Sequence, residues 1–138
     1  MTTPHRIVDP EALPRPVGYA HAVVAAPGRL VFLGGQVAHD ADGVVRGATV
    51  VEQFERAAVN VVAALAAAGS APEHVVSMQV FTTDVAAYRA ASKDLGVVYR
   101  AAFGRHYPAM AVVQVSELYD SDALVELVCT AVVPEGSA

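Results

Sequence analysis

The pattern of apolar and polar positions predicts short strands toward both ends of the chain and helical regions between them. Residues 21–26 and 30–33 are β-rich runs that flank Pro27-Gly28. A Pro-Gly pair supplies the backbone angles of a tight turn, so these runs predict a β-hairpin. A second turn signal at residues 39–43 leads into an expected short strand at 44–46.

Apolar residues recur at helical spacing over residues 50–68. Thr49 and Glu52 have the spacing of a capping box, in which each side chain accepts a hydrogen bond from a backbone N–H left free at the helix start. Gly69 supplies the stop. Polar residues such as Asn60 lie on one side, so the sequence predicts an amphipathic helix and not a membrane span.

A second helical region is predicted between Asp84, an N-cap residue, and Gly104. Gly96 lies inside it, and an interior glycine costs about 1 kcal/mol relative to alanine. We therefore expect two shorter helices joined near residues 92–96. A β-branched strand precedes this region, and two closing strands follow it, at residues 75–82, 110–115 and 124–133.

This order of elements predicts an α+β fold in which helices cover one face of a sheet. The chain, residues 1–138, is expected to form a single domain with an extended N-terminal segment at 1–16. Because 54% of the residues are hydrophobic and only 17% are charged, more apolar surface is available than a small monomer comfortably buries. We expect an oligomer, with a neighbouring subunit's sheet covering the other face.

Charge argues against nucleic-acid binding. The chain has 14 acidic and 9 basic residues and a net charge of -5, its only lysine is Lys93, and its arginines are spread singly along the sequence. A protein that binds phosphate backbones clusters such residues into a patch. No apolar secretory signal is visible near the N-terminus, so we expect a cytoplasmic protein without a membrane partner.

Cysteine and histidine usage gives no sign of a metal or a cofactor. A lone cysteine, Cys129, excludes an internal disulfide and a multi-cysteine zinc site, and it fits a reducing compartment. We interpret it as a small buried hydrophobe. The histidines have no ligand spacing, so no metal site is expected. His21, two residues after Tyr19, is the one histidine worth testing.

Several short segments, in this order and spacing, resemble the RidA/YjgF family. The resemblance covers residues 17–133, and its segments are Gly18-Tyr19-Ala20-His21-Ala22, Leu33-Gly34-Gly35-Gln36, residues 60–70, Val80-Phe81-Thr82-Thr83-Asp84, Val98-Tyr99 to Phe103-Gly104, Tyr107-Pro108-Ala109 and Leu124-Val125-Glu126-Leu127. It implies a chorismate-mutase-like α+β protomer, with a mixed sheet and two helices on one face, that forms homotrimers with a cleft at each subunit interface.

The resemblance also implies a chemistry, the hydrolysis of reactive enamines and imines to keto acids and ammonia. Glu126 matches the family's water-orienting glutamate, and Tyr19 matches the tyrosine at the mouth of the cleft. Gly34 and Gly35 would let the backbone approach the ligand, because they lack a Cβ. From position alone, Glu126 is a solvent-facing carboxylate and Tyr19 an interface aromatic, and these readings remain open.

One departure from the family pattern bears on the activity. The family places an arginine after the Pro-Ala pair, whereas here Met110 follows Pro108-Ala109. A thioether cannot replace a guanidinium that holds a carboxylate. Met110 is expected to line a less polar site as a specificity residue, with Ala111 and Val112 beside it in the substrate wall, although methionine is most often a core gap-filler. Arg105 is a weaker candidate for the missing cation.

The sequence therefore predicts a RidA-like hydrolase, of the enamine/imine deaminase type, that acts on a small molecule other than the usual 2-imino acids. A non-catalytic trimer that binds a metabolite or a protein through the same cleft is the alternative. The ribonuclease activity sometimes attached to this family would need salt-sensitive RNA binding, against which the charge of -5 argues.

Overall fold

The computed structural model describes residues 2–136, so the outermost residues of the predicted 1–138 domain, and residue 1 of the 1–16 segment, lie outside it. Its strands and helices follow in the order β1 (Arg6–Val8), β2 (Ala22–Val24), β3 (Gly28–Phe32), α1 (Val50–Ala67), a 3-10 turn (Pro72–His74), β4 (Val75–Thr82), α2 (Val85–Ala90), α3 (Ser92–Phe103), β5 (Ala109–Gln114) and β6 (Val125–Pro134).

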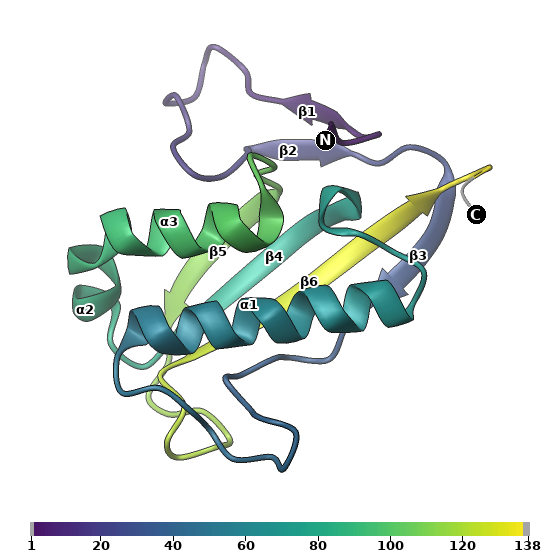
Figure 1. Ribbon diagram of the computed structural model, residues 1–138. Coiled ribbons are helices and arrows are strands. Elements are labelled where there is room, and N and C mark those ends of the chain that lie inside the picture. Colours follow the sequence, from purple (N-terminus) through teal and green to yellow (C-terminus); the bar gives the residue numbers. More distant parts are fainter. Residues whose placement is uncertain (1, 137–138) are drawn as a thin grey trace.

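The main sheet is mixed, which confirms the predicted α+β class. Its four strands lie in the order β3-β6-β4-β5, with β4 and β5 parallel and the other pairs antiparallel. The parallel pair requires a crossover connection, and α2 and α3 provide it. Figure 1 shows α1 and α3 lying across the same face of this sheet, while β1 and β2 form a separate ribbon.

Helix boundaries agree with the predicted caps. The Thr49 hydroxyl accepts a hydrogen bond from the Glu52 N–H at 3.2 Å, and the Glu52 carboxylate accepts one from the Ala48 N–H at 3.2 Å. Gly69 adopts φ +75, the left-handed conformation that ends many helices. The second helical region is split at Ala91, one residue before the expected joint, and Gly96 lies inside α3.

The predicted hairpin around Pro27-Gly28 is wrong. β2 pairs with β1, and β3 pairs with β6, so the two runs belong to different sheets. Val31 and Leu33 pack against the core beside β6, and this long-range burial outweighs the local turn preference. The short strand expected at 44–46 is likewise reduced to a single bridge, between His39 and Val45.

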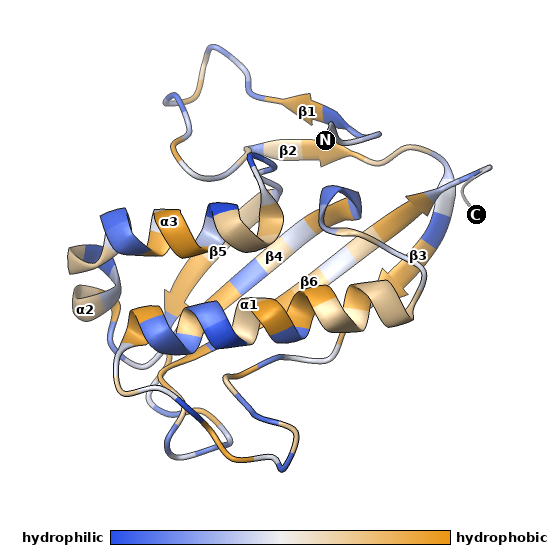
Figure 2. Ribbon diagram, viewed as in Figure 1, coloured by the Kyte–Doolittle hydropathy of each residue, from blue (hydrophilic) through white to orange (hydrophobic). Residues whose placement is uncertain are grey.

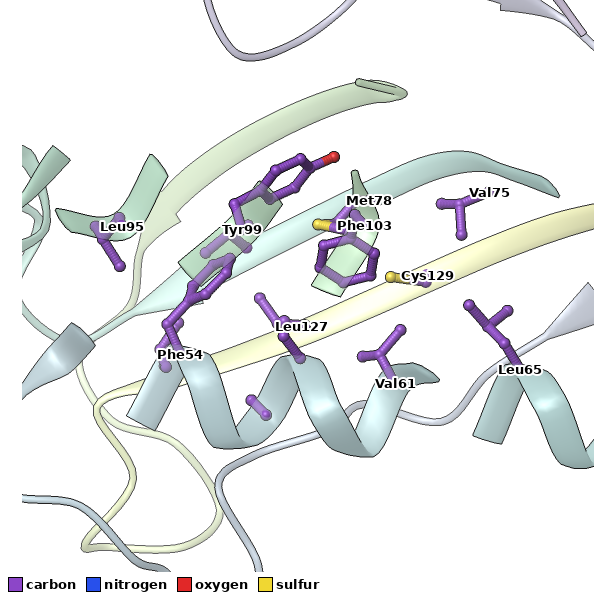
Figure 3. Close-up of a cluster of buried hydrophobic side chains, with 14 of the residues drawn as sticks. Phe54, Val61, Leu65, Val75, Met78, Leu95, Tyr99, Phe103, Leu127 and Cys129 are labelled. Carbon is purple, nitrogen blue, oxygen red and sulfur yellow. The ribbon is translucent and has the colours of Figure 1, made fainter. Parts of the chain in front are cut away.

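The core lies between the helices and the sheet. Figure 3 shows Phe54, Val61 and Leu65 of α1 facing residues of the strands and of α3, and each of the three is at most 1% exposed. Complete burial of one such side chain contributes about 1.5–3 kcal/mol. Figure 2 shows hydrophobic and hydrophilic residues interleaved along α1, as expected for a helix with one buried side.

Within residues 2–136, no helix covers the other face of the sheet. Leu30 and Phe32 of β3 are 61% and 72% exposed, and Val113 of β5 is 43% exposed. The pairing registers place these three side chains on the face opposite the helices. Within the described residues, no helix is long and apolar enough to cross a membrane.

Candidate functional site

A cavity of about 530 Å³ opens between α3 and the edge strand β5. Its volume lies in the range of small-molecule sites. The walls are mostly apolar or aromatic, and they are formed by Val17, Gly18, Tyr19, Phe54, Tyr88, Ser92, Leu95, Gly96, Tyr99, Arg100, Tyr107, Met110, Ala111 and Val112.

The helical wall is one stripe of α3. Leu95 and Tyr99 are one turn apart and are buried against the core, and Gly96 and Arg100 repeat the same spacing beside them. Residues at this spacing share a helix face. The sequence pattern that places Leu95 in the core therefore also turns Gly96 and Arg100 toward the cavity.

The strand wall comes from β5. Met110 is the register partner of Met78, which is fully buried under the helices, so the Met110 side chain points to the helix-covered face. Val112 follows on the same face. The Ala20 N–H donates a hydrogen bond to the Pro108 carbonyl at 3.0 Å, and this contact positions Tyr19 beside the start of β5. Tyr19, Met110, Ala111 and Val112 all line this one cavity.

The tyrosines of the cavity differ in how their hydroxyls are used. Tyr99 donates to the His106 carbonyl at 2.6 Å and stacks on Tyr107 with ring centroids 5.3 Å apart. Burial raises the pKa of Tyr88 to about 12, so its hydroxyl stays neutral and can donate. Tyr19, Tyr88 and Tyr107 make no side-chain hydrogen bond to another described residue, which leaves three hydroxyls free for a ligand.

Glu126 and Gly35 form a second arrangement, away from this cavity. Val125 and Leu127 are buried under the helices, so Glu126 between them faces the open side of the sheet. The Leu33 N–H donates a hydrogen bond to the Cys129 carbonyl, and the Gln36 N–H donates one to the Leu127 carbonyl. The three residue steps from Leu33 to Gln36 therefore lie opposite only two residue steps, from Cys129 to Leu127. This mismatch is a β-bulge at Gly34-Gly35.

The bulge brings the Gly35 backbone against the glutamate. A Cβ on residue 35 would lie 2.8 Å from Cδ and 2.9 Å from Oε1 of Glu126. For Gly34, no described residue other than its two chain neighbours has an atom within 4 Å of the corresponding position. Gly35, and not Gly34, is therefore the glycine that the carboxylate requires.

A single chain does not bring all the predicted site residues to one ligand. Glu126 and Met110 lie on opposite faces of the sheet, and β4 separates their strands. Two strand spacings alone amount to roughly 10 Å. The residues therefore fall into two groups, with Tyr19, Met110, Ala111 and Val112 in the cavity and Gly34, Gly35 and Glu126 on the open face.

The remaining candidates lie outside the cavity. The His21 ring is tied to the Pro14 carbonyl at 2.6 Å and meets the Tyr19 ring edge-on with centroids 5.2 Å apart. Arg105 lines a different cavity of about 480 Å³ beside the N-terminal segment. Cys129 is 1% exposed, and burial raises its pKa to about 12. Across residues 2–136 no group of three or more His, Cys, Asp or Glu side chains is arranged to hold a metal ion.

Sequence reasoning missed Arg100. Arg105 drew attention because it stands close to Pro108 in the sequence, whereas the cavity takes its cation from the preceding helical turn. The available signal was the four-residue spacing between Gly96 and Arg100, on the face of α3 that also carries Leu95 and Tyr99.

Comparisons with known proteins agree with this architecture. Residues 10–133 match the family model Endoribonuclease L-PSP. Protein DfrA of Myxococcus xanthus is 35% identical over 116 residues, which cover 82% of this chain and 85% of that protein. The crystal structure of the Rid-family protein YyfB from Yersinia pestis superimposes with a TM-score of 0.84 at 26% identity and covers 94% of this chain and 98% of that one.

RidA of an Antarctic Psychrobacter species is also similar in structure, with a TM-score of 0.67, 28% identity, and coverage of 93% of this chain and 99% of that one. The matched residues make up most of the sequence, and they include the helices as well as the strands of the main sheet. The chain therefore belongs to the Endoribonuclease L-PSP family, also called the RidA/YjgF family.

Proposed function

We propose that this protein is a hydrolase of the enamine/imine deaminase type, acting on a small molecule other than the usual 2-imino acids. The observation that carries the proposal is the Glu126 carboxylate, half-buried on the open face and held against Gly35 by a β-bulge. Among residues 2–136, Glu126 takes part in no ion pair, so the carboxylate is free to accept a proton from water.

The reaction needs only a positioned base and a neutral donor. Glu126 would accept a proton from water as the water oxygen bonds to the imine carbon, and would pass that proton to the nitrogen as the C=N bond becomes single. In the collapse of the resulting aminoalcohol, Glu126 would carry the hydroxyl proton to the nitrogen in the same way, so that the C=O bond forms, the C–N bond breaks and ammonia leaves. Tyr19, whose hydroxyl is free, would hold the substrate.

The two groups of site residues support a cleft between subunits. The exposed apolar residues Leu30, Phe32 and Val113 lie on the same sheet face as Glu126, and a second copy is a fitting cover for such a surface. β5 is also an edge strand. In a homotrimer, the Gly35 and Glu126 face of one subunit would meet the Tyr19 and Met110 cavity of the next.

Met110 supports a change of substrate relative to the family. Its side chain lies under the helices and packs against the core, where the family pattern would place a carboxylate-binding arginine. The Met110 thioether carries no charge, so it cannot form an ion pair with a substrate carboxylate attached to the reacting carbon. The natural substrate would therefore lack a carboxylate at that position.

The test is keto-acid release from 2-aminoacrylate and 2-aminocrotonate generated by a dehydratase. Wild type, Met110→Arg, Glu126→Gln and the double variant are compared, with Met110→Gln as the uncharged control for polarity. We expect an inactive wild type and a gain of activity in Met110→Arg that Glu126→Gln removes. No gain in folded Met110→Arg would contradict the proposal. Activity in the wild type would support the hydrolase and overturn the role given to Met110.

The alternative is a non-catalytic trimer that binds a metabolite or a protein partner through the same cleft. Met110 favours it, because the cavity has no cation where the family chemistry needs one. If Glu126→Gln leaves every activity untouched while ligand binding persists, the binding function is the correct one.

A further inference from the structure

Arg100 is the only charged side chain among the residues that line the main cavity. Apart from Ser92, the other lining residues are apolar, aromatic or glycine, and no acidic residue belongs to the lining. Within residues 2–136 it joins neither of the ion pairs, which are His39 with Asp120 and Arg46 with Asp40. The guanidinium therefore has its hydrogen-bond donors available to a ligand.

Gly96 makes room for this guanidinium. Helical side chains lean toward the residue four positions earlier, which for Arg100 is Gly96. A Cβ on residue 96 would lie 3.1 Å from Nη1 and 3.8 Å from both Cζ and Nη2 of Arg100. The charged group thus lies over the glycine, one turn back along α3, and not beyond the last carbonyls of the helix.

The position of the Arg100 guanidinium indicates that it does more than stabilise the end of its own helix. Arg100 belongs to the last turn of α3, where a positive charge complements the helix dipole. A side chain serving only that purpose has no need of a glycine beneath it, and Gly96 costs the helix about 1 kcal/mol relative to alanine. Gly96 and Arg100 form one unit that faces the cavity.

The rest of the cavity indicates what accompanies the charge. Leu95 and Met110 provide apolar wall, and the aromatic rings of Tyr88 and Tyr107 offer flat surfaces and two free hydroxyls. Such a site suits a compact apolar or aromatic body with one anionic group. A guanidinium prefers a carboxylate, which it can hold with two parallel hydrogen bonds.

We propose that Arg100, lying over Gly96, binds the carboxylate of a small organic monoacid whose apolar or aromatic body fills the cavity between α3 and β5. This inference deepens the proposed function and rests on it only in calling the monoacid a substrate. The carboxylate is held by α3, and not by the Met110 position of β5, so in a substrate it lies away from the carbon that reacts.

The test measures binding directly, by calorimetry or NMR titration of the full chain. Phenylacetate is the probe, phenylacetamide is its neutral counterpart, and inorganic phosphate is an anion without an apolar body. We expect phenylacetate to bind the wild type and to lose about tenfold or more in affinity in Arg100→Gln, the size of a lost charge-assisted contact. Phenylacetamide should bind more weakly and be indifferent to that substitution.

Two variants serve as matched comparisons. Arg105→Gln removes the same charge from the neighbouring cavity and should leave phenylacetate affinity unchanged. Gly96→Ala should raise thermal stability through helix propensity while lowering affinity severalfold, because the added methyl displaces the guanidinium. A loss of affinity without a loss of stability cannot come from misfolding.

The outcomes separate this inference from the proposed function. Failure of phenylacetate to bind the wild type, or equal losses in Arg100→Gln and Arg105→Gln, would overturn it. Phosphate binding as tightly as phenylacetate would do the same, since the apolar body would then contribute nothing. Arg100-dependent binding that persists in Glu126→Gln supports the site, whether or not either protein hydrolyses an imine.

Discussion

Gly35 and Glu126 meet so closely that a Cβ on residue 35 would require the end of the Glu126 side chain to move. A Cβ there would lie 2.8 Å from the carboxyl carbon of Glu126, a separation that real Cβ atoms do not show. The bulge that brings the two together spans Leu33 to Gln36, which are both tied to β6 by backbone hydrogen bonds. The backbone therefore cannot easily withdraw, and a substitution would move the carboxylate.

Gly35→Ala should abolish any activity that depends on Glu126 at little cost in stability, because the added methyl meets the flexible end of the Glu126 side chain, which can shift aside. Gly34→Ala is the matched control, because no described residue beyond its chain neighbours lies within 4 Å of its Cβ position. Turnover and thermal melts of both variants check this. Equal activity in Gly35→Ala and wild type would mean that the Glu126 carboxylate needs no fixed position.

Phe32→Glu should reduce the molecular mass in solution from oligomer to monomer. Phe32 is 72% exposed on the open sheet face, where a second copy would bury it, and an unpaired charge in such an interface is costly. Val59→Glu on α1, where the wild-type residue is 52% exposed, is the control and should keep the wild-type mass. Light scattering measures all three proteins, and a monomeric wild type would overturn the interface itself.

Periodicity predicts most of this fold because its strongest signals are local. The helix at α1 follows from one apolar stripe with caps at both ends, Thr49 and Gly69, and needs no information from elsewhere in the chain. The false hairpin shows the limit. Pro27-Gly28 signals a turn, but a turn signal does not determine which strands pair, and β3 gains more by packing Val31 beside β6.

The candidate site shows a similar limit. The alternation of apolar and polar residues predicts that Glu126 and Met110 belong to different strands. It does not predict that their side chains point to opposite faces of the sheet. That depends on the strand order, which puts β4 between them. Arg100 escaped notice because its significance arises from a neighbour, Gly96, whose effect is only visible once both lie against the cavity.

Cys129 should not react with a thiol reagent in the native protein. It is 1% exposed in the core, and burial raises its pKa to about 12, so neither access nor thiolate is present near neutral pH. Titration with Ellman's reagent should report no thiol before denaturation and one per chain in guanidinium, since the sequence has a single cysteine. Rapid native labelling would show that the strand opens far more readily than its packing implies.

His106 should make the fold less stable as the pH falls. The ring is 8% exposed, and its Nε2–H donates a hydrogen bond to the Val75 carbonyl at 2.7 Å. Burial lowers the pKa of His106. The nearby His5 and His74 also lower it, whereas the hydrogen bond to Val75 and the Glu73 carboxylate raise it.

The sign follows from proton binding. An unfolded histidine takes up a proton near pH 6.5, whereas the folded one resists it, so the unfolded state binds more protons in this range. The stability contributed by neutral His106 is complete above about pH 7 and declines as the pH falls toward the lowered folded pKa, by at most about 1.4 kcal/mol per pH unit for one proton.

Denaturant melts at pH 7.5, 6.5 and 5.5 check this. In His106→Gln the amide can still donate to the Val75 carbonyl, but it cannot titrate, so the variant should lose less stability over the same range. Parallel declines in the two proteins would assign the pH dependence to other groups, and His5 and His74 would be the next to replace.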